Sequence, residues 1–318
     1  MTSITLKRVV VTGIGIVSPL GCGNELVWQH LNDGNIGIIS LKNKISDKLI
    51  EETGVKIAGI VPHGTKSNDF DQKKLFIQGI EKELSLFVQY SILASDLALN
   101  HSKLKINLDD INAFDSTRAG VSIASGIGAL QEIVNSSRLL DLSYKKLSPY
   151  FVTKILPNMA SGHVSIRHKL QGPNICPATA CAAGSHAIGD AYNLIRLGHC
   201  DVMLAGGTEA SISDLSIAGF ARMKALSKES DPNNGSKPFD RDRNGFVIAD
   251  GAAVLVLEEL SHALKRQSPI IAEIVGYGLS GDSFHISTPE SNGDGAFRSK
   301  ILLNIFILKN NLSFCFYK

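Results

Sequence analysis

Short runs of β-branched residues alternate along the chain with segments whose apolar residues recur at helical spacing. A β-branched run that ends in glycine is typical of a buried strand, and apolar spacings of three and four are typical of an amphipathic helix. The polar interval 41–74 shows neither pattern, so we expect surface loops there. The pattern predicts strands at 8–18, 119–125, 174–179, 202–205 and 251–258, and helices at 25–32, 84–99, 153–170 (one or two) and 182–198.

The segment 174–205 indicates the fold class. A predicted strand, a helix and a second strand follow one another there. A connection of this kind joins parallel strands, because the helix carries the chain back across the sheet. We therefore expect an α/β fold built on a parallel sheet.

An internal similarity links two distant segments. Residues 11–18 (VTGIGIVS) resemble residues 274–281 (IVGYGLSG), each with a strand followed by Gly-x-Gly and an apolar residue. The similarity hints at a duplicated architecture. A dinucleotide-binding loop would need a third glycine where Ser18 stands, so nucleotide binding is not expected.

Composition narrows the possible functions. The net charge is +2 without long runs of one sign, which does not suggest nucleic-acid binding. Five cysteines without a CxxC pair suggest no zinc site and a reduced, intracellular protein. Asp240 begins a calcium-loop-like sequence, DRDRNG, but its twelfth position is Gly251 instead of glutamate. The apolar run 301–308 is too short to span a membrane, and the beginning lacks acidic residues before Glu25, which weakly favours a transit segment.

Cys181 is the candidate nucleophile. It follows a predicted strand and precedes a predicted helix, where the helix dipole and first-turn amides favour a thiolate. The small residues 182–185 leave room for a substrate carbonyl. From these features alone, a buried packing cysteine stays an open alternative. Cys176, inside the predicted strand, is interpreted as a packing residue.

The segment 172–188 (GPNICPATACAAGSHAI) resembles the active-site signature of the β-ketoacyl-acyl-carrier-protein synthases, most closely the mitochondrial type. The resemblance covers residues 8 to about 299. Small departures are Ala182, where Ser or Thr is usual, and Ala249-Asp250, where Gly-Glu is common. Further matching segments are RVVVTGIGIVSPLG (8–21), SGIGAL (125–130), NMASGHVSIRHKLQGPN (158–174), DVMLAGGTEASISDLSIAGFARMKALS (201–227), KPFDRDRNGFVIADGAAVLVLEE (237–259) and IVGYGLSGDSFHISTPE (274–290).

The resemblance implies a thiolase-like fold, in which two similar α/β halves pack as five α/β/α/β/α layers. It implies a homodimer, an acyl carrier protein as partner and no cofactor. Cys181 would take an acyl chain as a thioester, and malonyl-acyl carrier protein would then lose carbon dioxide and attack it. Ile127 and Phe220 match positions that line the acyl pocket and its gate. Lys73, Lys74 and Lys82 are candidate carrier-protein contacts.

Three family motifs are absent from the 318 residues: two histidine motifs and a glycine-rich phenylalanine loop. His285 matches a position outside the catalytic set. The tail 300–318 has a biased composition that suggests translated noncoding sequence. We expect residues 1–258 to form the first ketosynthase half, 259–299 the beginning of the second and 300–318 an unrelated tail. We also expect this chain to be inactive in condensation, with the apolar helix face 187–195 partly open.

Two alternatives stay open beside a fatty-acid synthase. One is a ketosynthase domain of a polyketide assembly line, and the other is a non-catalytic dimer partner, which typically lacks the cysteine. A free-standing eukaryotic synthase of this family is usually mitochondrial, so we expect a mitochondrial location, with the cytoplasm as the alternative.

Overall fold

The computed structural model describes residues 6–76, 80–104 and 114–309. Cys315 and residues 310–318 of the tail lie outside these ranges. The strands are β1 (Val9–Ser18), β2 (Gly21–Cys22), β3 (Ile38–Ser40), β4 (Ile57–Gly59), β5 (Ala119–Ala124), β6 (Asn174–Ile175), β7 (Val202–Glu209), β8 (Gly251–Glu259) and β9 (Ala272–Ile274). The helices are α1 (Asn24–Asn32), α2 (Asp47–Thr53), α3 (Gln72–Leu75), α4 (Leu86–Ser102), α5 (Leu130–Leu142), α6 (Phe151–Ile155), α7 (Met159–His168), α8 (Ala183–Arg196), α9 (Asp214–Arg222), α10 (Leu260–Lys265) and α11 (Asp294–Lys309).

The main sheet has the strand order β2-β1-β8-β7-β5-β6, with β9 paired to β1. Strands β6 and β7 lie on either side of β5 and run parallel to it, which confirms the predicted crossover through α8. The sheet as a whole is mixed, because β8 runs antiparallel to both β1 and β7. The expectation of a parallel sheet is therefore correct only for the part that holds the candidate site.

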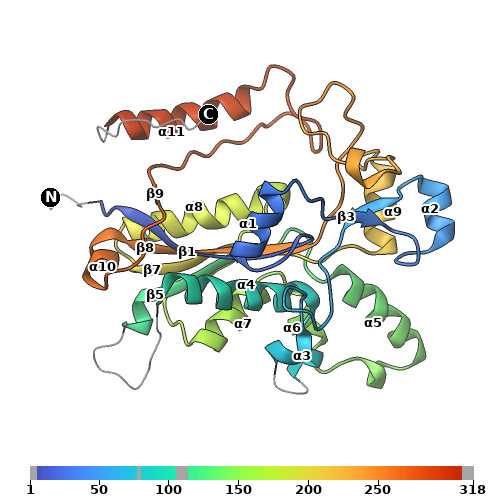
Figure 1. The fold of residues 1–318 in the computed structure, drawn as a ribbon, viewed down its shortest axis with the longest axis horizontal. Helices are drawn as coiled ribbons and strands as arrows, with labels where there is room; N and C mark the ends of the chain where they lie inside the picture. Colours follow the sequence, from blue (N-terminus) through green and yellow to red (C-terminus); the bar gives the residue numbers. More distant parts are fainter. Residues whose placement is uncertain (1–5, 77–79, 105–113, 310–318) are drawn as a thin grey trace.

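Helices cover both faces of this sheet (Figure 1). Helices α4 and α7 lie on one face and α8 on the other. One core lies between the sheet and α4 and α7, and a second lies between the sheet and α8. The described residues thus form three of the five layers that the family resemblance implies. Within the described ranges, no helix combines the length and apolarity needed to cross a bilayer.

Close packing explains the two glycines of TGIG. A Cβ atom on Gly13 would lie 2.3 Å from the carbonyl oxygen of Ala98, and one on Gly15 would lie 1.9 Å from that of Ala94. Both carbonyls belong to α4, so any side chain at these positions would push the helix off β1. The glycines are required by this helix contact, which agrees with the rejection of a nucleotide-binding loop.

The expectation of surface loops at 41–74 is wrong. The interval contains α2, β4 and α3, and the residues Leu41, Val55 and Ala58 are buried. Together with Ile217 of α9 and Leu226 they form a separate small core. Isolated apolar residues in a polar segment carry no periodic signal, so only the tertiary contact shows that they are buried.

The predicted strand at 174–179 is mostly irregular. Only Asn174 and Ile175 pair with β5, and Pro177 has no backbone N–H with which to extend the ladder. Cys176 therefore follows β6 instead of lying inside a strand.

The expectation of a partly open apolar face on α8 holds only for Ile188 and Leu194. Ala187, Ala191 and Ile195 are fully buried, because α8 packs against β7 and β5 of its own sheet. Of the remaining apolar positions, Ile188 and Leu194 are half-buried.

Strand β9 ends at Ile274, where the segment resembling residues 11–18 begins. It forms an edge strand antiparallel to β1, pairing with Val9, Val10 and Val11. The following residues run irregularly, and Tyr277 packs against the core beside α8.

Candidate active site

Cys181 lies in a 3-10 turn, Ala180–Ala182, that leads directly into α8. Its side chain is exposed. The structure thus confirms the predicted place at the amino-terminal end of a helix. It also argues against a buried packing cysteine.

The backbone before Cys181 is strained. Ala180 has φ of 51°, a left-handed conformation that costs a non-glycine residue about 1–2 kcal/mol. Strain of this kind persists only where the surroundings hold it, and it concentrates at functional sites. Here it turns the chain from the end of β6 into the start of α8 and leaves Cys181 at the surface.

A cleft of about 460 Å³ opens at Cys181. Its walls come from the carboxyl ends of β1, β5 and β7, the start of β8 and the first turn of α8. Ser125, Gly126, Glu209 and Asp250 supply polar groups to it. An exposed thiol in a cleft with nearby polar groups is suited to covalent acyl transfer.

The small residues after Cys181 serve packing as well as space. Ala183 is buried in a cluster with Ala124 of β5 and Ala187 of α8. Of the residues 182–185, which were expected to leave room for a substrate, Ala183 and Gly184 line the cleft. Ala182 and Ser185 are exposed but are not among the residues that line the cleft.

The other described cysteines are more protected. Burial raises the pKa of Cys22 to about 11, with a contribution from Asp69, and burial raises that of the fully buried Cys200 to about 11. Burial also raises the pKa of the half-buried Cys176, as suits the packing role predicted for it.

Among these four cysteines, Cys181 is expected to react first with a limiting amount of iodoacetamide near pH 7.5. The reason is that its thiol is exposed, whereas a thiol with a raised pKa supplies little thiolate. Peptide mapping by mass spectrometry measures the order. Earlier labelling of Cys22, Cys176 or Cys200 would contradict the assignment.

Asp250, beside the cleft, has an unusual pKa. Burial and then the nearby charge of Glu209 raise it to about 6, although the backbone amides of Ser211 and Ile212 donate hydrogen bonds to its Oδ1 at 2.9 and 3.2 Å. An aspartate in the unfolded chain ionises near pH 4. Between about pH 4 and pH 6 the folded state therefore holds more protons, and its stability falls as the pH rises.

At pH 7 the free energy of unfolding of the variant Asp250→Asn is expected to be about 1 kcal/mol higher than that of the wild type. At pH 4 the two free energies are expected to differ little. The amide oxygen of the variant still accepts from the two backbone amides but carries no charge. Urea unfolding at both pH values measures the difference. An equal difference at the two pH values would show that the ionisation of Asp250 is not responsible.

Ile127 and Phe220 lie in different surroundings. Ile127 follows three cleft-lining residues, is 36% exposed, and donates its backbone N–H to Glu209 Oε2 at 3.2 Å. Phe220 lies on α9, where its ring meets Phe246 edge-on with centroids 5.5 Å apart. The structure brings Ile127 next to the Cys181 cleft, whereas Phe220 is not among the residues that line the cleft.

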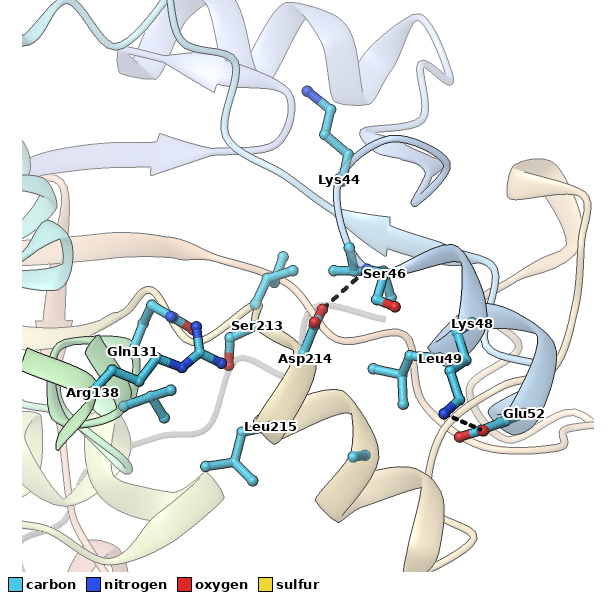
Figure 2. Close-up of a pocket in the computed structure, with 14 residues that line it drawn as sticks. Lys44, Ser46, Lys48, Leu49, Glu52, Gln131, Arg138, Ser213, Asp214 and Leu215 are labelled. Atoms are coloured by element: carbon cyan, nitrogen blue, oxygen red, sulfur yellow. Dashed lines mark hydrogen bonds and ion pairs between the residues drawn. The ribbon is translucent and has the colours of Figure 1, made fainter. Parts of the chain in front are cut away.

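A second, larger groove with a volume of about 700 Å³ lies between α5, α2 and α9. Figure 2 shows the residues that line it. Lys44, Lys48 and Arg138 give it a basic lining. Lys48 pairs with Glu52 at 3.7 Å, and Asp214 accepts a hydrogen bond from the backbone N–H of Ser46 at 3.2 Å. No cysteine is among its 14 lining residues.

The remaining candidates are not among the residues that line the cleft. His285 is exposed, and its Nδ1 accepts from the backbone amides of Ser287 and Thr288 at 3.2 and 3.1 Å. Lys73 and Lys74 are exposed on α3, and Lys82 is exposed in a short 3-10 turn.

Sequence reasoning missed Glu209 and Asp250. Both stand in segments that matched the family, AGGTEA and IADGAA, yet neither carries a spacing typical of catalysis. The available signal was position: Glu209 ends the buried strand β7, and Asp250 immediately precedes β8.

Comparison with known proteins agrees with this geometry. Residues 6–263 match the family model of the β-ketoacyl synthase amino-terminal domain. The chain is 45% identical over 297 residues to 3-oxoacyl-[acyl-carrier-protein] synthase 2 of Rhizobium meliloti, covering 92% of this chain and 69% of that protein. It is 45% identical over 303 residues to the mitochondrial 3-oxoacyl-[acyl-carrier-protein] synthase of Arabidopsis thaliana, covering 91% of this chain and 64% of that protein.

Solved structures show the same fold. A β-ketoacyl synthase from Burkholderia phymatum superposes with a TM-score of 0.80 at 30% identity, covering 96% of this chain and 71% of that one. The chain thus spans about two thirds of the length of its relatives. With an exposed Cys181 at the start of α8, a thiolase-like fold and these similarities, the chain belongs to the β-ketoacyl synthase family, the 3-oxoacyl-acyl-carrier-protein synthases that act as condensing enzymes of fatty-acid synthesis.

Proposed function

We propose that Cys181 accepts the growing acyl chain in the decarboxylative condensation that yields 3-oxoacyl-acyl carrier protein. The observation that carries the proposal is an exposed thiol at the amino-terminal end of α8, in a cleft of a β-ketoacyl synthase domain. In the first step the sulfur of Cys181 attacks the carbonyl of an acyl thioester. A new carbon–sulfur bond forms, the bond to the donor sulfur breaks, and the donor leaves as a thiol with the proton from Cys181.

We further propose that the polypeptide of these 318 residues performs this first step only. The condensation step requires a stabilised enolate, which the family resemblance assigns to the two histidine motifs absent from the sequence. Loss of even one donor that stabilises an oxyanion typically slows such a step by ~10²–10³. Residues 1–258 constitute the first ketosynthase half in this proposal, and residues 259–299 the start of the second.

Incubation with decanoyl-coenzyme A is expected to add one decanoyl group to Cys181, seen as a mass increase of its peptide. Addition of ¹⁴C-carboxyl-labelled malonyl-acyl carrier protein is then expected to release carbon dioxide no faster than a protein-free blank. Absence of the decanoyl adduct would refute the acyl-transfer step. Release of labelled carbon dioxide well above the blank would refute the restriction to the first step.

Fatty-acid synthesis is favoured over polyketide synthesis. The curated relatives at 45% identity are 3-oxoacyl-acyl-carrier-protein synthases, whereas a polyketide ketosynthase is 26% identical. The non-catalytic dimer partner is disfavoured because Cys181 is present and exposed.

An acyl carrier protein and a second copy of the chain are the proposed partners. Support comes from a solved type II polyketide ketosynthase in complex with its acyl-carrier protein (TM-score 0.79, 26% identity). Lys73, Lys74 and Lys82 are exposed and are the candidate contacts for an acidic carrier. Unchanged carrier affinity after reversal of all three charges would reject these lysines, and a monomeric mass in light scattering would reject the dimer.

The mitochondrion is the proposed location. Mitochondrial 3-oxoacyl-acyl-carrier-protein synthases occur among the relatives, at 45% identity in Arabidopsis thaliana and 42% in Schizosaccharomyces pombe. Fractionation of source cells with an antibody against the chain tests this location, and recovery in the cytosol alone would exclude it.

A further inference from the structure

Glu209 joins two strand ends beside the nucleophile. It is the last residue of β7, and its side chain reaches the loop that follows β5. Glu209 Oε2 accepts the backbone N–H groups of Gly126 and Ile127 at 2.8 and 3.2 Å. Glu209 Oε1 accepts the hydroxyls of Ser125 and Ser211 at 3.1 and 3.0 Å. One carboxylate thus receives four hydrogen bonds.

The loop that Glu209 holds also touches the residue before Cys181. A Cβ atom on Gly126 would lie 3.1 Å from Glu209 Oε2, 3.6 Å from the carbonyl oxygen of Ala180 and 3.7 Å from its Cα. Gly126 therefore lies between the carboxylate and the strained Ala180, although its outer side is exposed. Ser125 Oγ accepts the backbone N–H of Gly128 at 3.0 Å, which closes the turn.

Glu209 is itself fixed. Its backbone pairs with Gly251 of β8. The residues after it are held as well, because Asp250 Oδ1 accepts the backbone N–H groups of Ser211 and Ile212. The backbone that carries the Glu209 carboxylate is therefore held in place. A group that positions a neighbouring loop requires such support.

We propose that Glu209 is a positioning residue for acyl transfer. Its carboxylate holds the loop Ser125–Ile127 against Ala180 through hydrogen bonds. The loop then fixes the wall of the cleft in which an acyl thioester must lie to react with Cys181. The inference rests on the proposed acyl-transfer function. The inference does not depend on the condensation step. Glu209 acts through the loop, because the four groups that donate hydrogen bonds to its carboxylate belong to the loop and to Ser211.

The test compares Glu209→Ala with Glu209→Gln in the 318-residue protein. Two rates at Cys181 are measured for each: decanoyl transfer from decanoyl-coenzyme A and alkylation by iodoacetamide. A reaction that depends on how the cleft wall holds its substrate slows when that wall is misplaced. Glu209→Ala is therefore expected to lower the rate of decanoyl transfer about 10-fold relative to the rate of alkylation. Glutamine is expected to preserve the ratio, because its oxygen can accept both backbone amides and its NH₂ can donate to both hydroxyls.

A second measurement does not depend on acylation. Hydrogen exchange of the Gly126 and Ile127 amides, followed by NMR, is expected to quicken about 10-fold in Glu209→Ala and to stay unchanged in Glu209→Gln. The matched control is Glu229→Ala. The Glu229 carboxylate accepts hydrogen bonds from Lys237 and Asn244 and is not among the cleft-lining groups, so neither readout is expected to change.

Three results would overturn the proposal: an unchanged transfer-to-alkylation ratio in Glu209→Ala, retained protection of the two amides in that variant, or equal losses in the alanine and glutamine variants. If the wild type takes up no decanoyl group, the proposed function fails. Amide exchange in Glu209→Ala then still decides whether Glu209 holds the loop.

Discussion

Replacing Cys181 by alanine is expected to abolish covalent acylation of the protein by decanoyl-coenzyme A, with a fall of at least ~10³-fold in initial rate. The acyl–sulfur bond has no other atom on which to form in this cleft, since Cys181 is the sole thiol among its described lining residues. The measurement is the intact mass of the protein over the first minutes of reaction.

Cys176→Ala is the matched control, because Cys176 lies five residues away on the same segment and is half-buried. Its acylation rate is expected to stay within about twofold of the wild type, as for a substitution outside the reacting groups. Persistent acylation of Cys181→Ala at the wild-type rate, or its loss in Cys176→Ala, would assign the nucleophile elsewhere.

Arg266→Met is expected to lower the free energy of unfolding by about 3 kcal/mol, because it leaves a buried carboxylate without its main partner. Glu258 is fully buried and receives two hydrogen bonds from the Arg266 guanidinium, both at 2.6 Å. His262 Nδ1 lies 2.6 Å from the carboxylate, and the Thr12 hydroxyl donates to it at 2.9 Å. These contacts tie β1, β8 and α10 together, and methionine keeps the apolar stem while removing the charge.

The effect is also expected to depend on pH. Burial by itself would raise the pKa of Glu258, but the hydrogen bonds and charge of Arg266 and the contact with His262 outweigh it and hold the pKa below its ordinary value. A lowered carboxyl pKa gives stability that is present above the unfolded pKa, near pH 4.5, and is lost as the pH falls through the lower folded value. The difference between Arg266→Met and the wild type should therefore shrink below pH 4.

Urea unfolding at pH 7 and pH 3.5 measures both statements. Lys48→Met is the control, because Lys48 and Glu52 form an exposed pair whose removal is expected to cost less than ~0.5 kcal/mol. A loss in Arg266→Met no larger than in Lys48→Met would mean that the buried Glu258 does not depend on Arg266.

Periodicity located the elements whose burial follows directly from their own residues. The β-branched run at 8–18 became β1, and the helical spacing at 84–99 overlaps α4, which begins at Leu86 and ends at Ser102. The place of Cys181 was also predictable, since the order of strand, cysteine and helix in the sequence restricts the thiol to a helix start. Family motifs then pointed to acyl transfer, which geometry alone would have left among several covalent reactions.

Long-range contacts decided which other residues are buried and which of them share the cleft. The apolar residues within 41–74 lack any period, and Leu41 and Val55 are buried in a small core that they share with α9 and with Leu226 and Ile248. In the sequence, Glu209 and Asp250 are ordinary acidic residues that lie 41 positions apart. The pairing of β7 with β8 brings them to one cleft, where burial alters the pKa of Asp250 and Glu209 gains four donors.

The sequence by itself determined that Cys181 stands at a helix start, that the fold is α/β and which family the chain belongs to, because residue types and local spacing carry this information. Only the tertiary structure decided that the TGIG glycines admit a helix, that the apolar face of α8 is covered by its own sheet, and that Glu209 clasps the loop beside Cys181. Each of these depends on which strands become neighbours. That choice is made by the burial of the whole sheet between its helices, and no short stretch of sequence encodes it.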